Sequence, residues 1–302
     1  MSTPSSPMTP AVPVRGAGAV RAVLGECALW CDREQALWWT DIESRTLHRL
    51  DAAGRLDTFA LTQRVGSFAL CRSPGRLLLG LEQGVALYDW HTRRLLGDVV
   101  PVQPEQPTTR INDGRCDTQG RFVFGTFNEA RDGAPIGAYY RVDERMSVQR
   151  LPLPPVTVAN GIAFSPDGTR LYWCDSPTRC ILTADYHPDG TLGPPQEFAR
   201  LAHTDGFPDG AAVDAEGGLW VALWDGGAVV RFDPSGAITE RQALPVTRPT
   251  CPVFGGAGLD TLFVTTARIG LSAPALAGQP LAGAVLACAV GRRGLPPWRF
   301  AA

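Results

Sequence analysis

The chain has 302 residues, 44% of them hydrophobic and 19% charged, which is long enough to bury a large core in one domain or in two smaller ones. Lysine and arginine together number 28, against 30 aspartates and glutamates. This balance supplies neither a basic stripe that would neutralise the phosphates of a nucleic acid nor a block of charge that would hold the protein on a membrane.

The chain starts with MSTPSSPMTPAVPV, a segment rich in Ser, Thr and Pro that predicts a flexible N-terminal tail over residues 1–14 and a single domain over residues 15–302. The tail lacks the charged start and apolar run of a signal peptide, and no later stretch reaches the ~20 apolar residues that span a bilayer. We therefore expect a cytoplasmic protein whose partner is a small molecule, with no nucleic acid and no membrane.

Eight cysteines are scattered along the chain, with no Cys-x-x-Cys spacing and no nearby pair of histidines. In a cytosolic chain of this size, such a pattern favours buried free thiols over a metal or redox role. The cysteines are Cys27, Cys31, Cys71, Cys116, Cys174, Cys180, Cys251 and Cys288.

Beyond the tail, one unit recurs: a short strand, a turn built from Asp, Gly, Ser or Pro, and a second apolar strand. Six copies occur at a spacing of roughly 40 to 50 residues, near that of known propeller blades. In chain order, their second strands read ALWWT from Ala36, RLLLG from Arg76, RFVFG from Arg121, RLYWC from Arg170, GLWVA from Gly218 and TLFVT from Thr261. Each copy then continues into two more strands.

Six four-stranded units predict an all-β fold, a six-bladed β-propeller, in which radial repetition protects the edges of the sheets. The apolar runs are short, Gly and Pro are frequent, and no long stretch has a helical period. A β-sandwich is the alternative that this pattern leaves open. The pattern carries no information on the oligomeric state.

The same repeat brings polar residues into register. The innermost strand of a propeller blade lines the central channel, so the residue that enters this strand lies at the mouth of the channel. Counting back about 9 to 11 positions from each second strand reaches Glu26, Ser67, Asn112, Asn160, Asp209 and the Thr250–Cys251 region. Four of these six positions hold Glu, Asn, Asn and Asp, and we expect them to converge on one oxygen-lined site.

Glu26, Asn160 and Asp209 offer two carboxylates and an amide carbonyl. These hard oxygen ligands suit Ca²⁺, Mg²⁺ or Mn²⁺ and accept Zn²⁺ or Fe²⁺. Asn-Gly and Asp-Gly pairs also form turns, which would explain any one of these residues alone. Their common register favours instead a site for one divalent metal ion, whose identity the sequence leaves open.

Arg110 and Asn112, in RINDGRC, have donors and acceptors that suit the hydroxyl or carboxylate groups of a ligand held by the metal. An ordinary surface loop is the alternative. Because the chain direction alternates, residues that follow the second strands return to the same face. This adds four further candidates: Glu129, Asp175, Trp224 and Arg268.

The residues assembled so far resemble the senescence marker protein, gluconolactonase and luciferin-regenerating enzyme family over nearly the whole chain after the tail. Each shared segment is short, and their order and spacing make the resemblance specific. The segments include LGECALW, RINDGRCDTQGRFVFGT, NGIAFSPDGTRLYWCDS, FPDGAAVDAEGGLWVALWDGG and RPTCPVFGGAGLDTLFVTTAR.

The resemblance implies a six-bladed propeller with one catalytic divalent metal, bound by Glu26, Asn160 and Asp209. It also implies hydrolysis of a sugar lactone, an aldonolactone such as gluconolactone, xylonolactone or arabinonolactone. The family's substrate-contacting arginine and asparagine match Arg110 and Asn112. A further acidic contact follows the Gly-Thr of the third repeat in the family, where the nearest carboxylate of this chain is Glu129.

From the chemistry of such a site, we expect the metal to bind the lactone carbonyl oxygen and Asp209 to act as the general base for the attacking water. Glu26 would mainly hold the metal, although the sequence does not separate the roles of these two carboxylates. Two other functions stay open: a metal-dependent esterase or organophosphatase of the same fold, and a propeller that only binds ligands. The oxygen-rich mouth argues against the second.

Overall fold

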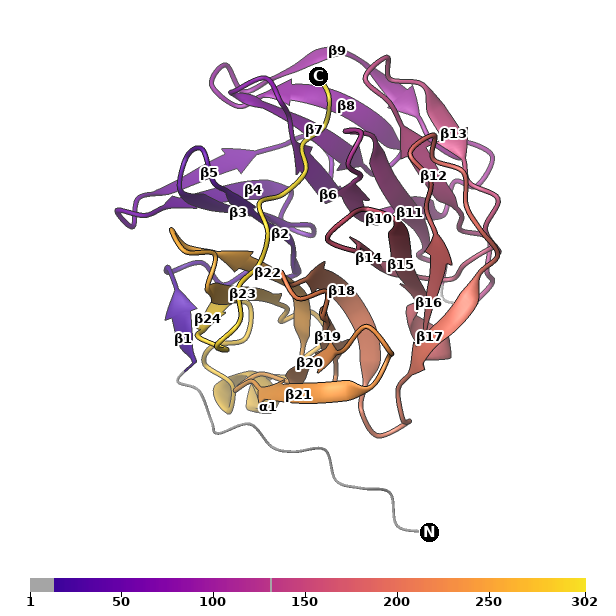
Figure 1. The fold of residues 1–302 in the computed structure, drawn as a ribbon. Helices are drawn as coiled ribbons and strands as arrows, with labels where there is room; N and C mark the ends of the chain where they lie inside the picture. The colour runs from indigo at the N-terminus through magenta and orange to yellow at the C-terminus, as the bar shows by residue number, and fades with distance from the viewer. Residues whose placement is uncertain (1–13, 131) are drawn as a thin grey trace.

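The computed structural model describes residues 14–130 and 132–302, so the predicted tail lies outside the described residues apart from Val14. Within them, 24 strands form six four-stranded antiparallel sheets that surround a central channel (Figure 1). The predicted six-bladed β-propeller is therefore confirmed. The alternative β-sandwich is excluded, since the six sheets are arranged radially rather than as two packed layers.

The strands take the same four positions in each sheet. The innermost position holds β2 (Gly25–Cys31), β6 (Val65–Leu70), β10 (Thr109–Cys116), β14 (Ala159–Phe164), β18 (Phe207–Val213) and β22 (Pro249–Gly255). The second holds β3 (Ala36–Asp41), β7 (Arg76–Leu81), β11 (Phe122–Asn128), β15 (Arg170–Asp175), β19 (Leu219–Trp224) and β23 (Thr261–Thr266). The third holds β4 (Thr46–Asp51), β8 (Gly84–Asp89), β12 (Tyr139–Val142), β16 (Cys180–Asp185), β20 (Ala228–Phe232) and β24 (Val285–Cys288). The outermost holds β5 (Leu56–Ala60), β9 (Arg94–Pro101), β13 (Val148–Arg150), β17 (Gln196–Arg200), β21 (Ile238–Ala243) and β1 (Arg15–Ala17).

All six second strands start at the predicted residue or one residue after it, because local turn chemistry determines where they begin. In the turn before β11, one oxygen of Asp117 accepts from the backbone N–H groups of Gln119 and Arg121 at 3.0 and 2.9 Å. Gly120 adopts a φ of +88° there, which favours glycine. This Asp-x-x-Gly turn therefore marks the start of the strand from the sequence alone.

The ring is closed by the N-terminal strand. β1 pairs with β24 in the sixth sheet, with Arg15 opposite Ala287, so the last blade combines both ends of the chain. Two short helical turns, η1 (Ser176–Thr178) and α1 (Ala273–Ala277), complete the secondary structure. Among the described residues, no helix is long and apolar enough to cross a membrane.

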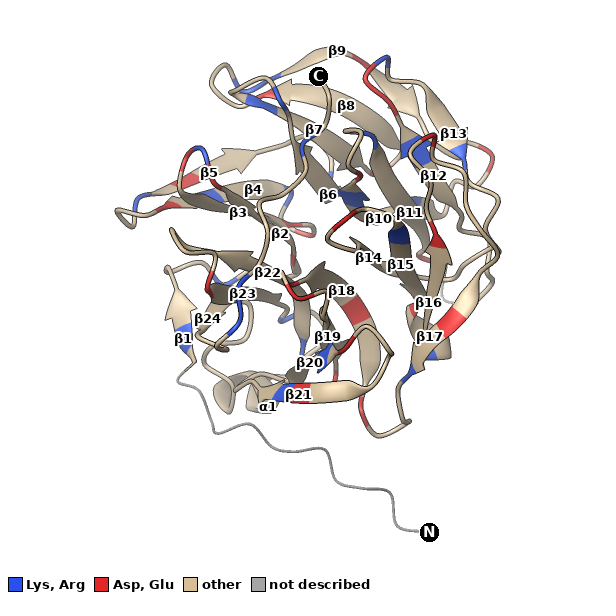
Figure 2. Ribbon diagram, viewed as in Figure 1, with Lys and Arg blue, Asp and Glu red and all other residues tan. Residues whose placement is uncertain are grey.

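The core lies between neighbouring sheets. Trp38 of β3, Phe68 of β6 and Leu79 of β7 pack in one such layer, and their side chains are fully buried. All eight cysteines are buried and free, which confirms the prediction of free thiols. Charged residues of both signs are spread over the blades and also occur on strands around the centre (Figure 2). Some of those near the centre line the candidate site.

Candidate active site

One end of the central channel widens into a cavity of about 530 Å³, close to the size of a small-molecule site. It is lined by six of the predicted site residues: Glu26, Arg110, Asn112, Glu129, Asn160 and Asp209. Trp224 lines it as well. Asp175 and Arg268 are not among its lining residues, and Asp175 instead accepts hydrogen bonds from the backbone of Thr157 and Val158.

At the site, the pairing between the innermost and second strands is irregular. The register of β2 against β3 shifts between Glu26 and Leu29, and that of β14 against β15 shifts between Asn160 and Ala163. Such a bulge adds a residue to one strand and changes the direction of nearby side chains. Gly161 follows Asn160 with a φ of +65°. The bulges thus let residues at the strand starts face the channel axis rather than a neighbouring sheet.

Glu26 and Asp209 are the two carboxylates predicted to hold the metal, and their surroundings disfavour negative charge. Burial, together with the nearby charge of Asp113, raises the pKa of Glu26 to about 8. Burial, with the charges of Glu26 and Asp113, raises the pKa of Asp209 well above its ordinary value. Both shifts are those of acidic groups that lack a cation beside them.

The nearby guanidinium groups are engaged with other carboxylates. Arg110 Nε lies 3.0 Å from Glu129 Oε1, and Arg115 Nη1 lies 3.9 Å from Asp113 Oδ1. The described part of the chain contains no cluster of three or more His, Cys, Asp or Glu side chains of metal-binding geometry. Glu26, Asp209 and the amide oxygen of Asn160 form instead a mixed oxygen set. This set suits a hard divalent cation, because the buried carboxylate of Asp209 and the half-buried carboxylate of Glu26 balance its charge.

Arg110 is buried against the wall of the cavity, with its guanidinium 4.9 Å from the ring centre of Phe127. Its Nη1 donates to Ile111 O at 3.0 Å and to Asn112 Oδ1 at 2.7 Å, while Nε donates to Glu129. Within residues 14–130 and 132–302, Nη2 has no protein acceptor. Arg110 therefore keeps a donor for a ligand in the cavity.

Asn112 is more fully engaged than the sequence suggested. Its Nδ2 donates to Ala159 O and to Asn160 Oδ1, both at 2.9 Å, and its Oδ1 accepts from Arg110. Only a remaining lone pair on Oδ1 is available to a ligand. Asn112 thus holds Arg110 and Asn160 in place, and its predicted contact with substrate stays a prediction.

Glu129 links two arginines at the rim of the cavity. Besides accepting from Arg110, it accepts from Arg64 Nη1 and Nη2 at 2.8 and 2.7 Å. Burial acts to raise the pKa of Glu129, but the hydrogen bonds and charges of Arg64 and Arg110 outweigh it and leave the pKa below its ordinary value. Glu129 is therefore an anion that fixes Arg110.

Sequence reasoning missed Arg64 and Ser176. Arg64 precedes β6 and also pairs with Glu82, and Ser176 donates a hydrogen bond to Pro208 O at 2.7 Å. Ser176 could have been noticed because it follows the second strand of its blade, where other candidates were sought. The repeat does not reveal Arg64, since two of its partners, Glu43 and Glu129, come from other blades.

Two positions that share the predicted register do not reach the cavity. Ser67 is fully buried in β6. Thr250 Oγ1 donates to Gly25 O and lies 2.8 Å from Thr265 Oγ1. Thr250 therefore joins the first and sixth blades, and four of the six positions in the ring supply the polar site.

Comparison with known proteins shows which family the chain matches. Residues 24–268 match the SMP-30/Gluconolactonase/LRE-like region. An L-arabinolactonase of Azospirillum brasilense is 45% identical over 283 residues, which cover 93% of each chain. A 6-deoxy-6-sulfogluconolactonase of Pseudomonas putida is 40% identical over 274 residues, covering 89% of this chain and 92% of the relative.

Among solved structures, the calcium-binding protein regucalcin from Agrobacterium tumefaciens superimposes with a TM-score of 0.90. It is 28% identical in sequence, and the match covers 96% of this chain and 98% of that one. The similarity therefore extends over the whole propeller and includes every blade that contributes to the cavity.

Proposed function

The chain belongs to the SMP-30/gluconolactonase/LRE-like family and is a lactonase, and from this premise we propose that it hydrolyses an aldonolactone with the help of one divalent metal ion. The substrate we favour is a pentonolactone of the arabinonolactone type. The relative with 45% identity is named for that activity. Gluconolactone and xylonolactone belong to the same chemical class.

One observation carries the proposal: the carboxylates of Glu26 and Asp209, which have no ion-pair partner among the described residues, line the same cavity as the free guanidinium donor of Arg110. Glu26, Asn160 and Asp209 are the residues that would hold the metal. The similarity to a calcium-binding regucalcin supports a metal and makes Ca²⁺ the first ion to test. When bound, a divalent ion supplies positive charge that stabilises the negative charge developing on the lactone carbonyl oxygen.

Hydrolysis requires a proton acceptor beside the attacking water. The water oxygen bonds to the carbonyl carbon, the ring C–O bond breaks, and the ring oxygen leaves as a hydroxyl. We assign Asp209 to accept the proton of the water and to return one to the ring oxygen.

In this proposal, Arg110 selects the substrate. Arg110 Nη2 can donate to hydroxyl groups of a sugar ring, while an alkyl lactone would leave this buried donor without an acceptor. An unpaired buried donor costs about 1–3 kcal/mol. We therefore expect aldonolactones to exceed unsubstituted lactones by about 10- to 100-fold in kcat/KM.

A pH-stat assay of lactone opening, corrected for spontaneous hydrolysis, tests this proposal. The panel contains the lactones of arabinonic, xylonic, gluconic and galactonic acid, with γ-butyrolactone and a long-chain acyl lactone as controls. Higher kcat/KM on γ-butyrolactone, or on simple esters or phosphotriesters, would contradict the sugar-lactone assignment.

Metal dependence is tested on the same substrates. Protein treated with a chelator and shown by elemental analysis to be metal-free should lose turnover, and Ca²⁺, Zn²⁺, Mg²⁺ or Mn²⁺ should restore it. Undiminished turnover by metal-free protein would remove the metal from the mechanism and leave the lactonase activity in place.

A further inference from the structure

Asn160 can present either of two chemically different ends to the cavity. Its Oδ1 can bind a cation, whereas its Nδ2 carries two hydrogens and cannot. A half-turn of the amide exchanges the two ends with little change in the shape of the side chain. The groups around Asn160 must therefore determine which end faces the carboxylates.

On one side, a buried hydroxyl determines the orientation. Ser176 is the first residue of η1, and its Oγ donates to Pro208 O at 2.7 Å. A carbonyl can only accept, so the hydroxyl hydrogen points to Pro208. The lone pairs of Oγ are left for a donor, and Asn160 Nδ2 lies 2.9 Å away. The amide nitrogen is thereby held on the side of Ser176.

On the other side, Asn112 meets groups that also have a single polarity. Arg110 can only donate, and it donates to Asn112 Oδ1 at 2.7 Å. Ala159 O can only accept, and it accepts from Asn112 Nδ2. The second hydrogen of Nδ2 is directed to Asn160 Oδ1 at 2.9 Å. Both neighbours of Asn160 therefore require the same orientation of its amide.

We propose that Ser176 is a positioning residue of the metal site: its hydroxyl holds the Asn160 amide so that Oδ1 faces the cation bound by Glu26 and Asp209. This inference rests on the proposed metal dependence. The hydrogen bonds run in one direction, from Arg110 through Asn112, Asn160 and Ser176 to the carbonyl of Pro208. Since Pro208 directly precedes Asp209, the Ser176 hydroxyl also ties two of the three ligands together.

The test measures Ca²⁺ affinity by titration calorimetry on chelated protein, a readout that does not depend on turnover. Ser176→Ala should raise the Kd for Ca²⁺ by ~10- to 100-fold, the usual cost of removing a group that orients a ligand. Thr178→Ala is the matched control, because Thr178 donates to Asp175 O within the same turn and does not contact Asn160. Its Kd should equal that of the wild type.

Asn160→Asp separates orientation from general damage. A carboxylate has an oxygen at each end, so Ser176→Ala should change the Kd by less than ~3-fold in this background. Near-UV circular dichroism checks that each variant folds. Should Ser176→Ala not fold, the nearly isosteric Ser176→Cys takes its place. It should give a smaller loss of affinity than alanine would, since a thiol still forms hydrogen bonds, although weaker ones.

Wild-type affinity in folded Ser176→Ala would overturn the role of Ser176 alone. If Ser176→Ala weakens Ca²⁺ binding equally in the wild type and in the Asn160→Asp variant, Ser176 does not act by orienting the Asn160 amide. If the wild-type protein binds neither Ca²⁺ nor Mn²⁺ nor Zn²⁺, both the metal dependence and the role of Ser176 are wrong, which distinguishes failure of the proposed function from failure of this inference.

Discussion

The central channel has a polar end and an apolar end, and the same inner strands supply both. β2 contributes Glu26 to the polar end and Leu29 to the apolar one, and β14 contributes Asn160 and Phe164 in the same way. The polar cavity measures about 530 Å³ and the apolar one about 130 Å³. Both strands thus change along their length from polar residues that line the larger cavity to apolar residues that line the smaller one.

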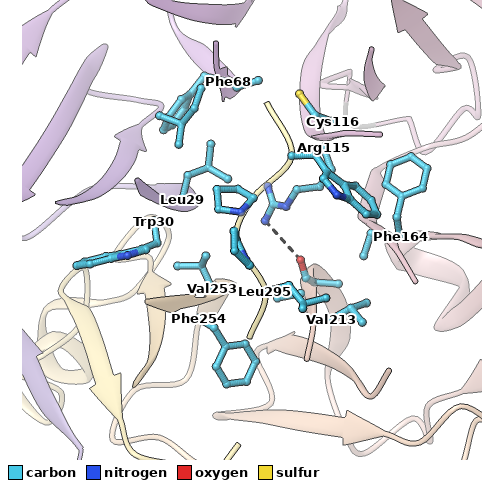
Figure 3. A pocket seen from close by; sticks show the side chains of 18 of the residues that line it. Leu29, Trp30, Phe68, Arg115, Cys116, Phe164, Val213, Val253, Phe254 and Leu295 are labelled. Carbon is cyan, nitrogen blue, oxygen red and sulfur yellow. Dashed lines mark hydrogen bonds between the residues drawn. The ribbon is translucent and has the colours of Figure 1, made fainter. Parts of the chain in front are cut away.

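The apolar end is covered by the C-terminal segment. Leu295 and the residues up to Trp298 lie across it, facing Phe68, Val213 and Val253 of the inner strands (Figure 3). Backbone hydrogen bonds hold this segment at both ends, from Gly294 N to Leu259 O and from Phe300 N to Leu70 O. The segment therefore joins the sixth blade to the second.

Arg115 lies between the two ends and shows how the difference is maintained. Although it borders the apolar cavity (Figure 3), it donates to Gly114 O at 3.1 Å, to Cys251 Sγ at 3.0 Å and to Ala211 O at 3.4 Å. A buried charge is tolerated where such partners satisfy it. Among the described residues, the channel thus satisfies its buried charges except at Glu26 and Asp209, where a ligand can supply the missing partner.

The largest expected effect comes from removing charge at the polar end. Asp209→Asn should lower kcat on the best sugar lactone by ~10²- to 10⁴-fold, because the amide cannot accept the proton of the attacking water. Steady-state kinetics measure this loss, and Val253→Ala at the apolar end serves as the control with unchanged kcat. A loss below ~10-fold in Asp209→Asn would assign the base elsewhere.

The unpaired carboxylates should also make the metal-free protein sensitive to alkali. Glu26 has a higher pKa in the folded protein than in the unfolded chain, so the folded state binds more protons between the ordinary value of 4.5 and about 8. The free energy of unfolding must then fall as pH rises through that window. We expect a decrease of at most about 5 kcal/mol, since one pKa unit corresponds to about 1.4 kcal/mol.

Urea unfolding of chelated protein at pH 5 and pH 9 measures this decrease. Glu26→Gln, which cannot ionise, should show a weaker dependence on pH than the wild type. If the free energy of unfolding depends equally on pH in the two proteins, Glu26 is ionised throughout this range or is well hydrated.

The apolar end should affect stability without affecting catalysis. Trp298 packs edge-on against Phe164, with ring centres 5.9 Å apart. Trp298→Ala should lower the free energy of unfolding by about 1–2 kcal/mol, less than for a fully buried aromatic residue. Urea denaturation measures the stability and the lactone assay measures kcat/KM. A large fall in kcat/KM at full stability would mean that the two ends are coupled.

The smallest effect is expected at the rim. Glu129→Gln keeps an acceptor for Arg110 but removes the charge that holds Arg110 and Arg64, so KM for the sugar lactone should rise ~3- to 10-fold with little change in kcat. Glu197→Gln removes an exposed pairing with Arg200, at 2.6 Å, and serves as the control. A kcat effect larger than the KM effect would place Glu129 in the chemical step.

Much of the fold follows from the sequence alone, because its signals are local. Alternating apolar residues and Asp-x-x-Gly turns mark strands such as β11 wherever they occur, and their six repetitions specify the number of blades. The same periodicity brings Glu26, Asn160 and Asp209 into register, and the structure has all three lining one cavity. Residue type and spacing were sufficient for these results.

The tertiary structure decided which polar groups meet across blades. Ser67 and Thr250 share the register of the site residues but are buried away from the cavity, while Ser176 and Arg64 reach partners 32 and 65 residues away in the chain. Periodicity specifies how far along a blade a residue lies, whereas hydrogen bonds between blades depend on how the closed ring tilts and packs its sheets. For this reason the sequence predicts the ligands of the site, and only the folded ring determines which groups orient them.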